Sequence, residues 1–189
     1  VEGEKCAVLA NPPLFAYTDA ATVNQAAVDE ALVLAHRIFG DPVDDADLFS
    51  QAADKAAAKC QMEMLKRAAK IEGTVLKAVN KAKKRALKET ADNSALAFEM
   101  ALLAVFSSDD KITGTEEKLV NGVDKKCARL QIAPDAIFPG ACAKATLSEI
   151  ESCVIAAARC AACSKVNAFD AQHLDCDQAD DRVLNGSCP

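Results

Sequence analysis

The sequence is poor in the residues that most active sites and nucleic-acid interfaces use. It has no tryptophan, one tyrosine and two histidines among 189 residues. Proteins that bind nucleic acid usually combine a basic face with aromatic side chains that stack on bases, whereas this chain has a net charge of −6. Two histidines leave little imidazole for acid–base catalysis or for zinc. The composition argues against a nucleic-acid partner, and we expect no enzymatic activity.

Long apolar runs are also missing. No stretch approaches the ~20 apolar residues that a membrane-spanning helix needs, and the closest, residues 95–106, is interrupted by Glu99. Hydrophobic residues nevertheless make up 51% of the chain and charged residues 26%, which is typical of a packed globular protein. The sequence therefore predicts a folded chain of about one domain without a membrane span.

Cysteine is the residue that the chain has in abundance, with nine copies. A zinc ribbon needs two CxxC pairs, and only Cys160 and Cys163 have that spacing. A c-type haem needs a histidine where Ser164 stands. A thioredoxin-like CxxC lies at a strand-to-helix junction, whereas this one follows an alanine-rich helical run. Disulfide bonds are the favoured interpretation, and they predict a secreted, periplasmic or cell-surface location.

Sequence spacing does not determine the pairing of these cysteines. Cys60 and Cys127 lie on inward helical stripes, where they could also be free buried thiols, and a bond from Cys127 to Cys142 across a loop is one possible pair. Nine is an odd number, so Cys6 in the N-terminal arm is the candidate for an intermolecular bond, with a leftover buried thiol as the alternative. We expect a C-terminal tail wrapped back on the last helix to bring its cysteines together. The disulfide candidates are Cys60, Cys127, Cys142, Cys153, Cys160, Cys163, Cys176 and Cys188.

Helical periodicity predicts the fold. From Cys60 to Ala86 apolar residues recur at spacings of three and four, which indicates one long amphipathic helix. Thr22 with Gln25, and Thr146 with Glu149, have the spacing of a capping box. Residues 95–106 are apolar nearly all round, which predicts a buried central helix after which a polar loop covers 107–114. No segment alternates apolar and polar residues. The sequence therefore predicts an all-α, disulfide-braced bundle of about five helices, over 22–39, 60–86, 95–106, 115–130 and 146–165.

We expect a single domain over 1–189, made of an extended arm (1–21), the helical bundle (22–165) and a turn-rich, acidic, cysteine-containing tail (166–189). Lysines and arginines fill the polar side of the 60–86 helix. A nucleic acid or an anionic membrane could bind such a run, but with a net charge of −6 the favoured interpretation is a solvated face offset by acidic neighbours.

Two further groups have the chemistry of metal ligands. The tail offers carboxylates that suit calcium, although it lacks the glycine and terminal glutamate of an EF-hand loop, so a solvated acidic tail is the alternative. Cys60, Met62 and Met64 are soft ligands of the kind that bind Cu(I), but on a helix Met62 points away from the other two. The calcium candidates are Asp170, Asp175, Asp177 and Asp180; no other cofactor is expected.

Three cysteine-containing segments carry a resemblance to a group of proteins. They are Lys59-Cys60 in a lysine- and alanine-rich helix, Lys125-Lys126-Cys127, and the run from Cys153 through Cys160 to Cys163. Over about residues 55–188 the chain resembles uncharacterised secreted helical cysteine-rich proteins of bacteria. The resemblance implies export and disulfide bonds, and it implies no activity.

These observations favour a secreted structural or interaction subunit whose partner is a protein, either copies of itself or a larger extracellular assembly. Disulfides would reinforce a core that is poor in large side chains, and the arm with Cys6 would join subunits. A carrier of a small apolar ligand or pigment in a cavity between helices is one alternative. A calcium-binding exported protein is the other.

Overall fold

The computed structural model describes residues 18–29, 32–43, 48–86, 95–170, 172–181 and 183–188. Within these ranges the chain forms eight helices and no strand, which confirms the predicted all-α class. Residues 1–17 of the predicted arm, including Cys6, lie outside the described residues. The helix count exceeds the predicted five because one predicted helix is divided and two short helices are added.

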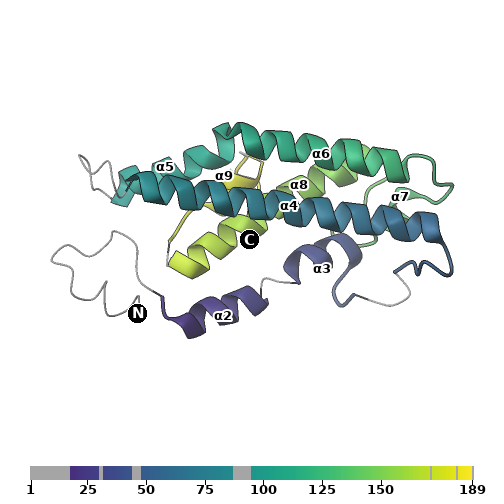
Figure 1. Ribbon diagram of the computed structural model, residues 1–189, viewed down its shortest axis with the longest axis horizontal. Coiled ribbons are helices and arrows are strands. Elements are labelled where there is room, and N and C mark those ends of the chain that lie inside the picture. Colours follow the sequence, from purple (N-terminus) through teal and green to yellow (C-terminus); the bar gives the residue numbers. More distant parts are fainter. Residues whose placement is uncertain are drawn as a thin grey trace.

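Two long helices form one side of the molecule. Helix α4 (Lys55–Ala86) and helix α6 (Asp110–Cys127) run antiparallel along most of its length, as Figure 1 shows. Helix α8 (Leu147–Asp170) packs against both. The buried apolar residues of these three helices form the centre of the core.

The remaining helices surround this centre. Helices α2 (Ala20–Asp29) and α3 (Val33–Phe39) pack against α8, and α5 (Ala95–Ser108) packs against α4. The short helix α7 (Pro134–Ile137) belongs to the connection between α6 and α8, and α9 (Cys176–Asp180) packs on α8. The C-terminal segment is therefore folded back onto the last long helix, as the sequence predicted.

Helix α4 confirms the predicted long amphipathic helix. Its N-terminal amides at Ala56 and Ala57 both donate to Asp54 Oδ1 at 2.9 Å, which caps the helix. The apolar stripe faces the core, with the side chains from Cys60 to Val79 fully buried and Ala82 and Ala86 partly buried. Burial of one complete stripe, at about 25 cal/mol per Å² of apolar surface, explains why this helix runs through Gly73 without interruption.

The predicted helix over 22–39 is wrong in its extent and in its buried face. The structure has two helices, α2 and α3, and Asp19 rather than Thr22 caps the first: Thr22 N donates to Asp19 Oδ1 at 2.7 Å. By helical spacing Val28, Leu32, Ala35 and Phe39 form the stripe predicted to face the core. Phe39 is buried and Ala35 is partly buried, but Val28 and Leu32 are 68% and 58% exposed. Helix α3 buries Leu34, Ile38 and Phe39. Its packing against α8 determines which of its faces is buried.

The segment from 95 to 127 differs from the prediction at two points. Helix α6 begins at Asp110, not Thr115, because Asp109 caps it by accepting from Lys111 N at 2.9 Å. The predicted loop over 107–114 is therefore mostly helical. Helix α5 was predicted to be buried all round, but it buries Leu102 and Phe106 and leaves Met100 62% exposed.

Helix α8 begins with the predicted capping box. Glu149 N donates to Thr146 Oγ1 at 3.3 Å, and Thr146 N donates to Glu149 Oε2 at 3.2 Å. The helix continues to Asp170, so the first residues assigned to the tail are helical.

One close contact joins α3 to the loop before α8. The amide of Gly140 donates to Ile38 O at 3.1 Å, and that of Cys142 donates to Arg37 O at 3.1 Å. A Cβ on Gly140 would lie 2.6 Å from the carbonyl carbon of Ile38 and closer still to the Arg37 carbonyl oxygen. This approach of two backbones requires glycine at position 140.

Candidate functional site

All eight cysteines that were predicted to form disulfides are paired with one another. Cys60–Cys127 joins α4 to α6, and Cys142–Cys153 joins the loop before α8 to that helix. Cys160–Cys188 and Cys163–Cys176 join α8 to the C-terminal segment. The suggested Cys127–Cys142 pair is wrong, because the antiparallel packing of α4 and α6 places Cys60 opposite Cys127. Cys6 lies outside the described residues.

The two C-terminal disulfides hold a compact unit, which we call the C-terminal cap (residues 172–181 and 183–188). Cys160 and Cys163 have CxxC spacing, but they bond to the cap and not to each other. Because residues three apart share a face of a helix, both bonds leave α8 on the same side. The CxxC motif therefore attaches α8 to the cap at two points.

Asp177 organises the cap. Its carboxylate accepts from the amides of Asn185 at 2.7 Å and Gly186 at 3.0 Å, and from that of Cys188 at 3.3 Å. The hydrogen bond from Gly186, together with those from its neighbours, lowers the pKa of Asp177. Asp177 is therefore ionised at neutral pH, and its contribution to stability is lost as the pH falls through its folded pKa.

The other calcium candidates have separate structural contacts. Asp175 caps α9 by accepting from Asp177 N and Gln178 N. Asp180 accepts from Ser187 Oγ at 2.7 Å, and burial raises its pKa. Asp170 forms an ion pair with Lys83 of α4.

Asp177 and Asp180 are the two calcium candidates that the structure brings together, since both accept from the hydroxyl of Ser187. Within the described ranges, no three or more His, Cys, Asp or Glu side chains are arranged to hold a metal. Calcium binding stays a prediction.

Arg37 connects the N-terminal helices to the cap. Its Nη1 donates to Ser187 O at 3.2 Å, and its Nη2 lies 3.8 Å from Cys160 Sγ. This one side chain of α3 thus contacts both the end of the cap and the disulfide that attaches it. No sequence signal separates Arg37 from the other surface arginines.

Three ion pairs attach α8 to the two long helices. Lys165 Nζ lies 2.6 Å from Glu72 Oε1 of α4, and Lys83 of α4 pairs with Asp170. Arg159 Nε lies 2.6 Å from Glu116 Oε1 of α6. Their side chains are only 10–17% exposed.

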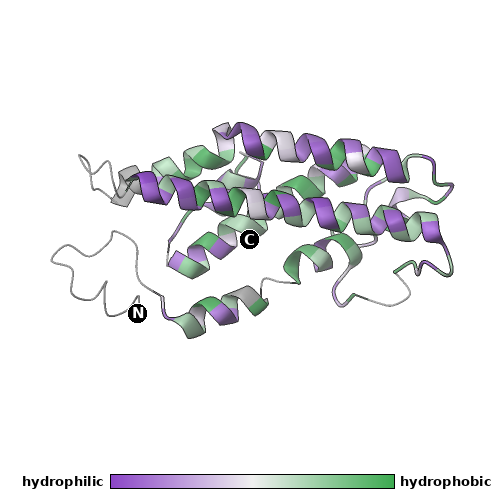
Figure 2. Cartoon of the chain, viewed as in Figure 1, coloured by the Kyte–Doolittle hydropathy of each residue, from purple (hydrophilic) through white to green (hydrophobic). Residues whose placement is uncertain are grey.

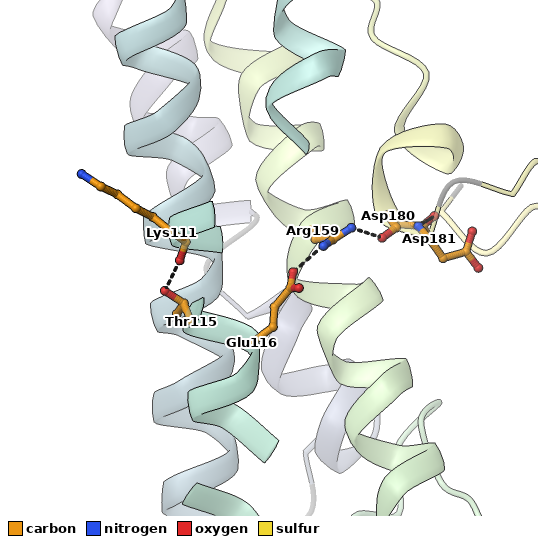
Figure 3. A network of polar contacts seen from close by, with 6 residues as sticks. All are labelled: Lys111, Thr115, Glu116, Arg159, Asp180 and Asp181. Carbon is orange, nitrogen blue, oxygen red and sulfur yellow. Dashed lines mark hydrogen bonds and ion pairs between the residues drawn. The ribbon is translucent and has the colours of Figure 1, made fainter. Parts of the chain in front are cut away.

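Arg159 also reaches the cap. Figure 3 shows its guanidinium between Glu116 on one side and Asp180 on the other, where Nη1 donates to the Asp180 carbonyl at 3.3 Å. Removing one partner of such a shielded pair leaves a charge without compensation. The pairs therefore fix the position of α8 and of the cap behind it.

Glu151 is a buried carboxyl on the same helix interface. It is 3% exposed, and among the described residues its Oε1 is the buried side-chain atom without a hydrogen-bond partner. Burial, and secondarily the charge of Asp124, raises the pKa of Glu151 to about 7. Glu151 and Asp124 lie eight residues from Arg159 and Glu116 on their respective helices, in the same antiparallel register. The α6–α8 interface thus has an attractive pair at one level and a repulsive pair two turns away.

A cleft lies between the C-terminal end of α4 and helix α5. Its volume is about 310 Å³ and it is partly open to solvent. Alanine side chains of both helices form much of its wall, with charged groups at Arg85 and Asp109. The lining residues are Ala82, Arg85, Ala86, Ala101, Ala104, Val105, Ser108 and Asp109.

The soft-metal hypothesis at Cys60, Met62 and Met64 has no geometric support. Cys60 is bonded to Cys127, and Met64 is fully buried, whereas Met62 is 58% exposed. The histidines lie apart from these residues. His36 lies 3.5 Å from Asp41 in the turn after α3, and His173 is exposed at the start of the cap.

No family model, no curated protein and no solved structure matches this chain. Among the helices that the structure describes, none has the length and hydrophobicity needed to cross a membrane.

Proposed function

We propose that this protein is an exported structural or interaction subunit that joins copies of itself or a larger extracellular assembly through Cys6. The observation that carries the proposal is the cysteine pairing. Four disulfides use eight of the nine cysteines within the chain. Cys6 is left without an internal cysteine to bond with, and an odd cysteine in an exported protein favours an intermolecular bond.

The rigidity of the described part also supports a structural role. In the chain-entropy description each disulfide contributes about 3–4 kcal/mol, and the largest contribution comes from Cys60–Cys127, which closes a loop of 67 residues. Such bonds persist outside the cytoplasm, which fits an extracellular or periplasmic location. A subunit reinforced in this way keeps its shape, while Cys6 links it to its neighbour.

A Cys6→Ser variant tests the proposal. We expect the wild-type protein to run as disulfide-linked oligomers on non-reducing gels and in size exclusion with light scattering, and the variant to run as a monomer. The variant should keep four disulfides by mass and the wild-type Tm, which separates loss of assembly from loss of fold. Equal molar masses for the two proteins under non-reducing conditions, with Cys6 open to alkylation, would overturn the proposal.

The cleft between α4 and α5 supports a second candidate function, the carriage of a small apolar ligand. Its size, about 310 Å³, lies at the lower end of the range of small-molecule pockets, and its wall is largely alanine and valine. The charged groups at Arg85 and Asp109 would orient a ligand with one polar end.

An Ala104→Phe variant, which fills the cleft, tests this second function. Native mass spectrometry of the protein from its natural source should show a bound small molecule. In a fluorescence titration, Ala104→Phe should bind an apolar dye with lower affinity than the wild type does. Met100→Phe on the exposed side of α5 is the control, because Met100 does not line the cleft. A wild-type protein that carries no ligand and binds the dye no better than Ala104→Phe would exclude the carrier function.

A further inference from the structure

The exposed side of α4 carries lysines in a regular row. Lys55, Lys66 and Lys77 follow each other at intervals of eleven residues, and Lys59, Lys70 and Lys81 repeat the interval four residues later. Eleven residues make about three turns of an α-helix, so residues at this spacing lie one above another. With Lys84 the row has seven members: Lys55, Lys59, Lys66, Lys70, Lys77, Lys81 and Lys84.

Each of these seven side chains is exposed. The row extends over about 44 Å, since α-helices rise about 1.5 Å per residue. None of the ion pairs found among the described residues includes a lysine of the row; the acidic residues of α4 pair elsewhere, Glu63 with Arg67 and Glu72 with Lys165. Within the described part, no carboxylate thus lies within 4.0 Å of the ammonium group of a lysine of this row.

Helix α6 adds a second basic row beside the first. Gly122 marks the side of α6 that meets α4, because a Cβ there would lie 2.9 Å from Glu63 Oε1. Lys118 and Lys125 lie four residues before and three residues after Gly122, so they share its side of the helix. Lys111 continues this row, and Figure 3 shows it pointing to the opposite side of α6 from Glu116. Glu116 of α6 thus faces α8, whereas Lys111, Lys118 and Lys125 lie on the side toward α4.

Charge is distributed unevenly along the chain. Helix α4 has ten lysines and arginines against two glutamates, a net of +8, so the rest of the chain carries −14. The acidic residues of α9 lie on the far side of α8 from α4, as the order of the helices in Figure 3 shows. Among the described residues, this arrangement favours an orientation in which α4 faces an anionic surface.

We propose that the basic face, formed by the seven lysines of α4 with Lys111, Lys118 and Lys125 of α6, docks on the anionic headgroup surface of a lipid bilayer. Two straight antiparallel helices make this face long and flat, and Figure 2 shows hydrophilic residues along much of both helices on this side. Lysines are hydrated point charges on flexible stems, which suits contact with many mobile headgroups rather than one fixed ligand.

Other anionic partners fit this face less well. A linear polymer would follow one row, whereas the face has two. A second copy of the chain would have to offer an acidic face of similar length, but its acidic cap is built on α9, a helix of five residues. Met62, which is 58% exposed, lies between Lys59 and Lys66 and is the large apolar side chain that α4 exposes, so charge dominates the docking, which is peripheral and sensitive to salt. It is independent of assembly through Cys6.

Co-sedimentation of the full chain with vesicles tests the docking. Vesicles of phosphatidylcholine alone are compared with vesicles that contain about 30% phosphatidylglycerol, in 50 mM and 300 mM NaCl. We expect binding to the anionic vesicles only, and weaker binding in 300 mM NaCl. Lys70→Gln should raise the Kd about 5-fold and Lys70→Gln with Lys77→Gln about 25-fold, since each lysine near an anionic bilayer contributes about equally.

Lys144→Gln is the matched control, because Lys144 is exposed in the loop before α8 and outside the basic face. It should leave the Kd unchanged, and all variants should keep the wild-type Tm. The proposal is overturned if the protein ignores anionic vesicles in 50 mM NaCl, or if Lys70→Gln binds them as well as Lys144→Gln does. Binding to soluble polyphosphate without binding to vesicles would assign the face to a linear polymer instead.

Discussion

Replacing Glu151 with glutamine should make the stability of the protein much less dependent on pH. Burial raises the pKa of Glu151 from 4.5 to about 7 in the folded state. The folded protein therefore holds this proton more tightly than the unfolded chain does, and stability falls as the pH rises from about 4.5 to about 7. At 1.36 kcal/mol for each unit of pKa, the full penalty is about 3 kcal/mol above pH 7. Glutamine cannot ionise and so never incurs it.

Urea unfolding of wild type and Glu151→Gln between pH 4 and pH 8 measures this penalty, with Cys6 alkylated in both to prevent disulfide exchange. Burying the amide adds a cost that does not vary with pH, so the informative quantity is the change in the stability difference. We expect that difference to move by about 3 kcal/mol in favour of the variant, or roughly 8 °C in Tm. Asp124→Asn in the wild-type background should reduce the loss of stability between pH 4 and pH 8 in part, because the charge of Asp124 contributes to the raised pKa of Glu151.

Glu117→Gln removes an exposed carboxylate from α6 and is the matched control, for which we expect a flat difference. Parallel stability profiles for wild type and Glu151→Gln across this range would refute the reasoning. Such a result would mean that Glu151 is solvated or paired in the folded protein. The unsatisfied Oε1 would then have a partner in solution.

Three further predictions concern glycine, the cap and calcium. Gly140→Ala should lower the free energy of unfolding by about 1–3 kcal/mol, because the added Cβ would overlap the backbone of α3. Gly73→Ala should raise the free energy of unfolding by about 0.5–1 kcal/mol, since nothing lies within 4 Å of the added carbon. Thermal melts of the two variants test both values. Asp177→Ala should speed reduction of Cys160–Cys188 by limiting dithiol, measured by alkylation and peptide mapping, because the amides that it holds are released; an unchanged rate would contradict its role in the cap. A chelator should leave the wild-type Tm unchanged, since the tail carboxylates already have protein donors, and a lower Tm would instead support calcium binding.

Local patterns in the sequence predict the local parts of this structure. The stripe from Cys60 to Val79 and the Thr146–Glu149 capping box depend on residues three or four apart, and both are present as expected. Disulfide formation by eight cysteines also follows from composition and spacing alone. Their pairing does not, because it depends on which helices are neighbours. Cys127 bonds to Cys60, which is 67 residues away in the sequence, while Cys142, which is closer to Cys127 in the sequence, bonds to Cys153 of α8.

The missed groups are those whose role comes from tertiary contacts. Arg37 and Glu151 look like ordinary surface residues in the sequence, and only the packing of α8 against its neighbours brings one to the cap and buries the other. Val28 and Leu32 fit a helical stripe but lie outside the core. The interval of eleven residues between lysines, in contrast, can be read from the sequence. The structure was needed to show that these lysines are exposed and which ion pairs the neighbouring residues form.

The attachment of the cap to α8 has a consequence for how the chain matures. During synthesis the N-terminal part of a chain emerges first, so Cys160 and Cys163 appear before their partners Cys176 and Cys188. In that interval the two thiols lie one turn apart on a helix, within reach of each other, and the closest available partner is the wrong one. The native bond of Cys160 waits for Cys188. A Cys160–Cys163 bond formed in that interval would have to be exchanged before the native pairs form, and a chain truncated before position 176 would keep both thiols open to that mispairing.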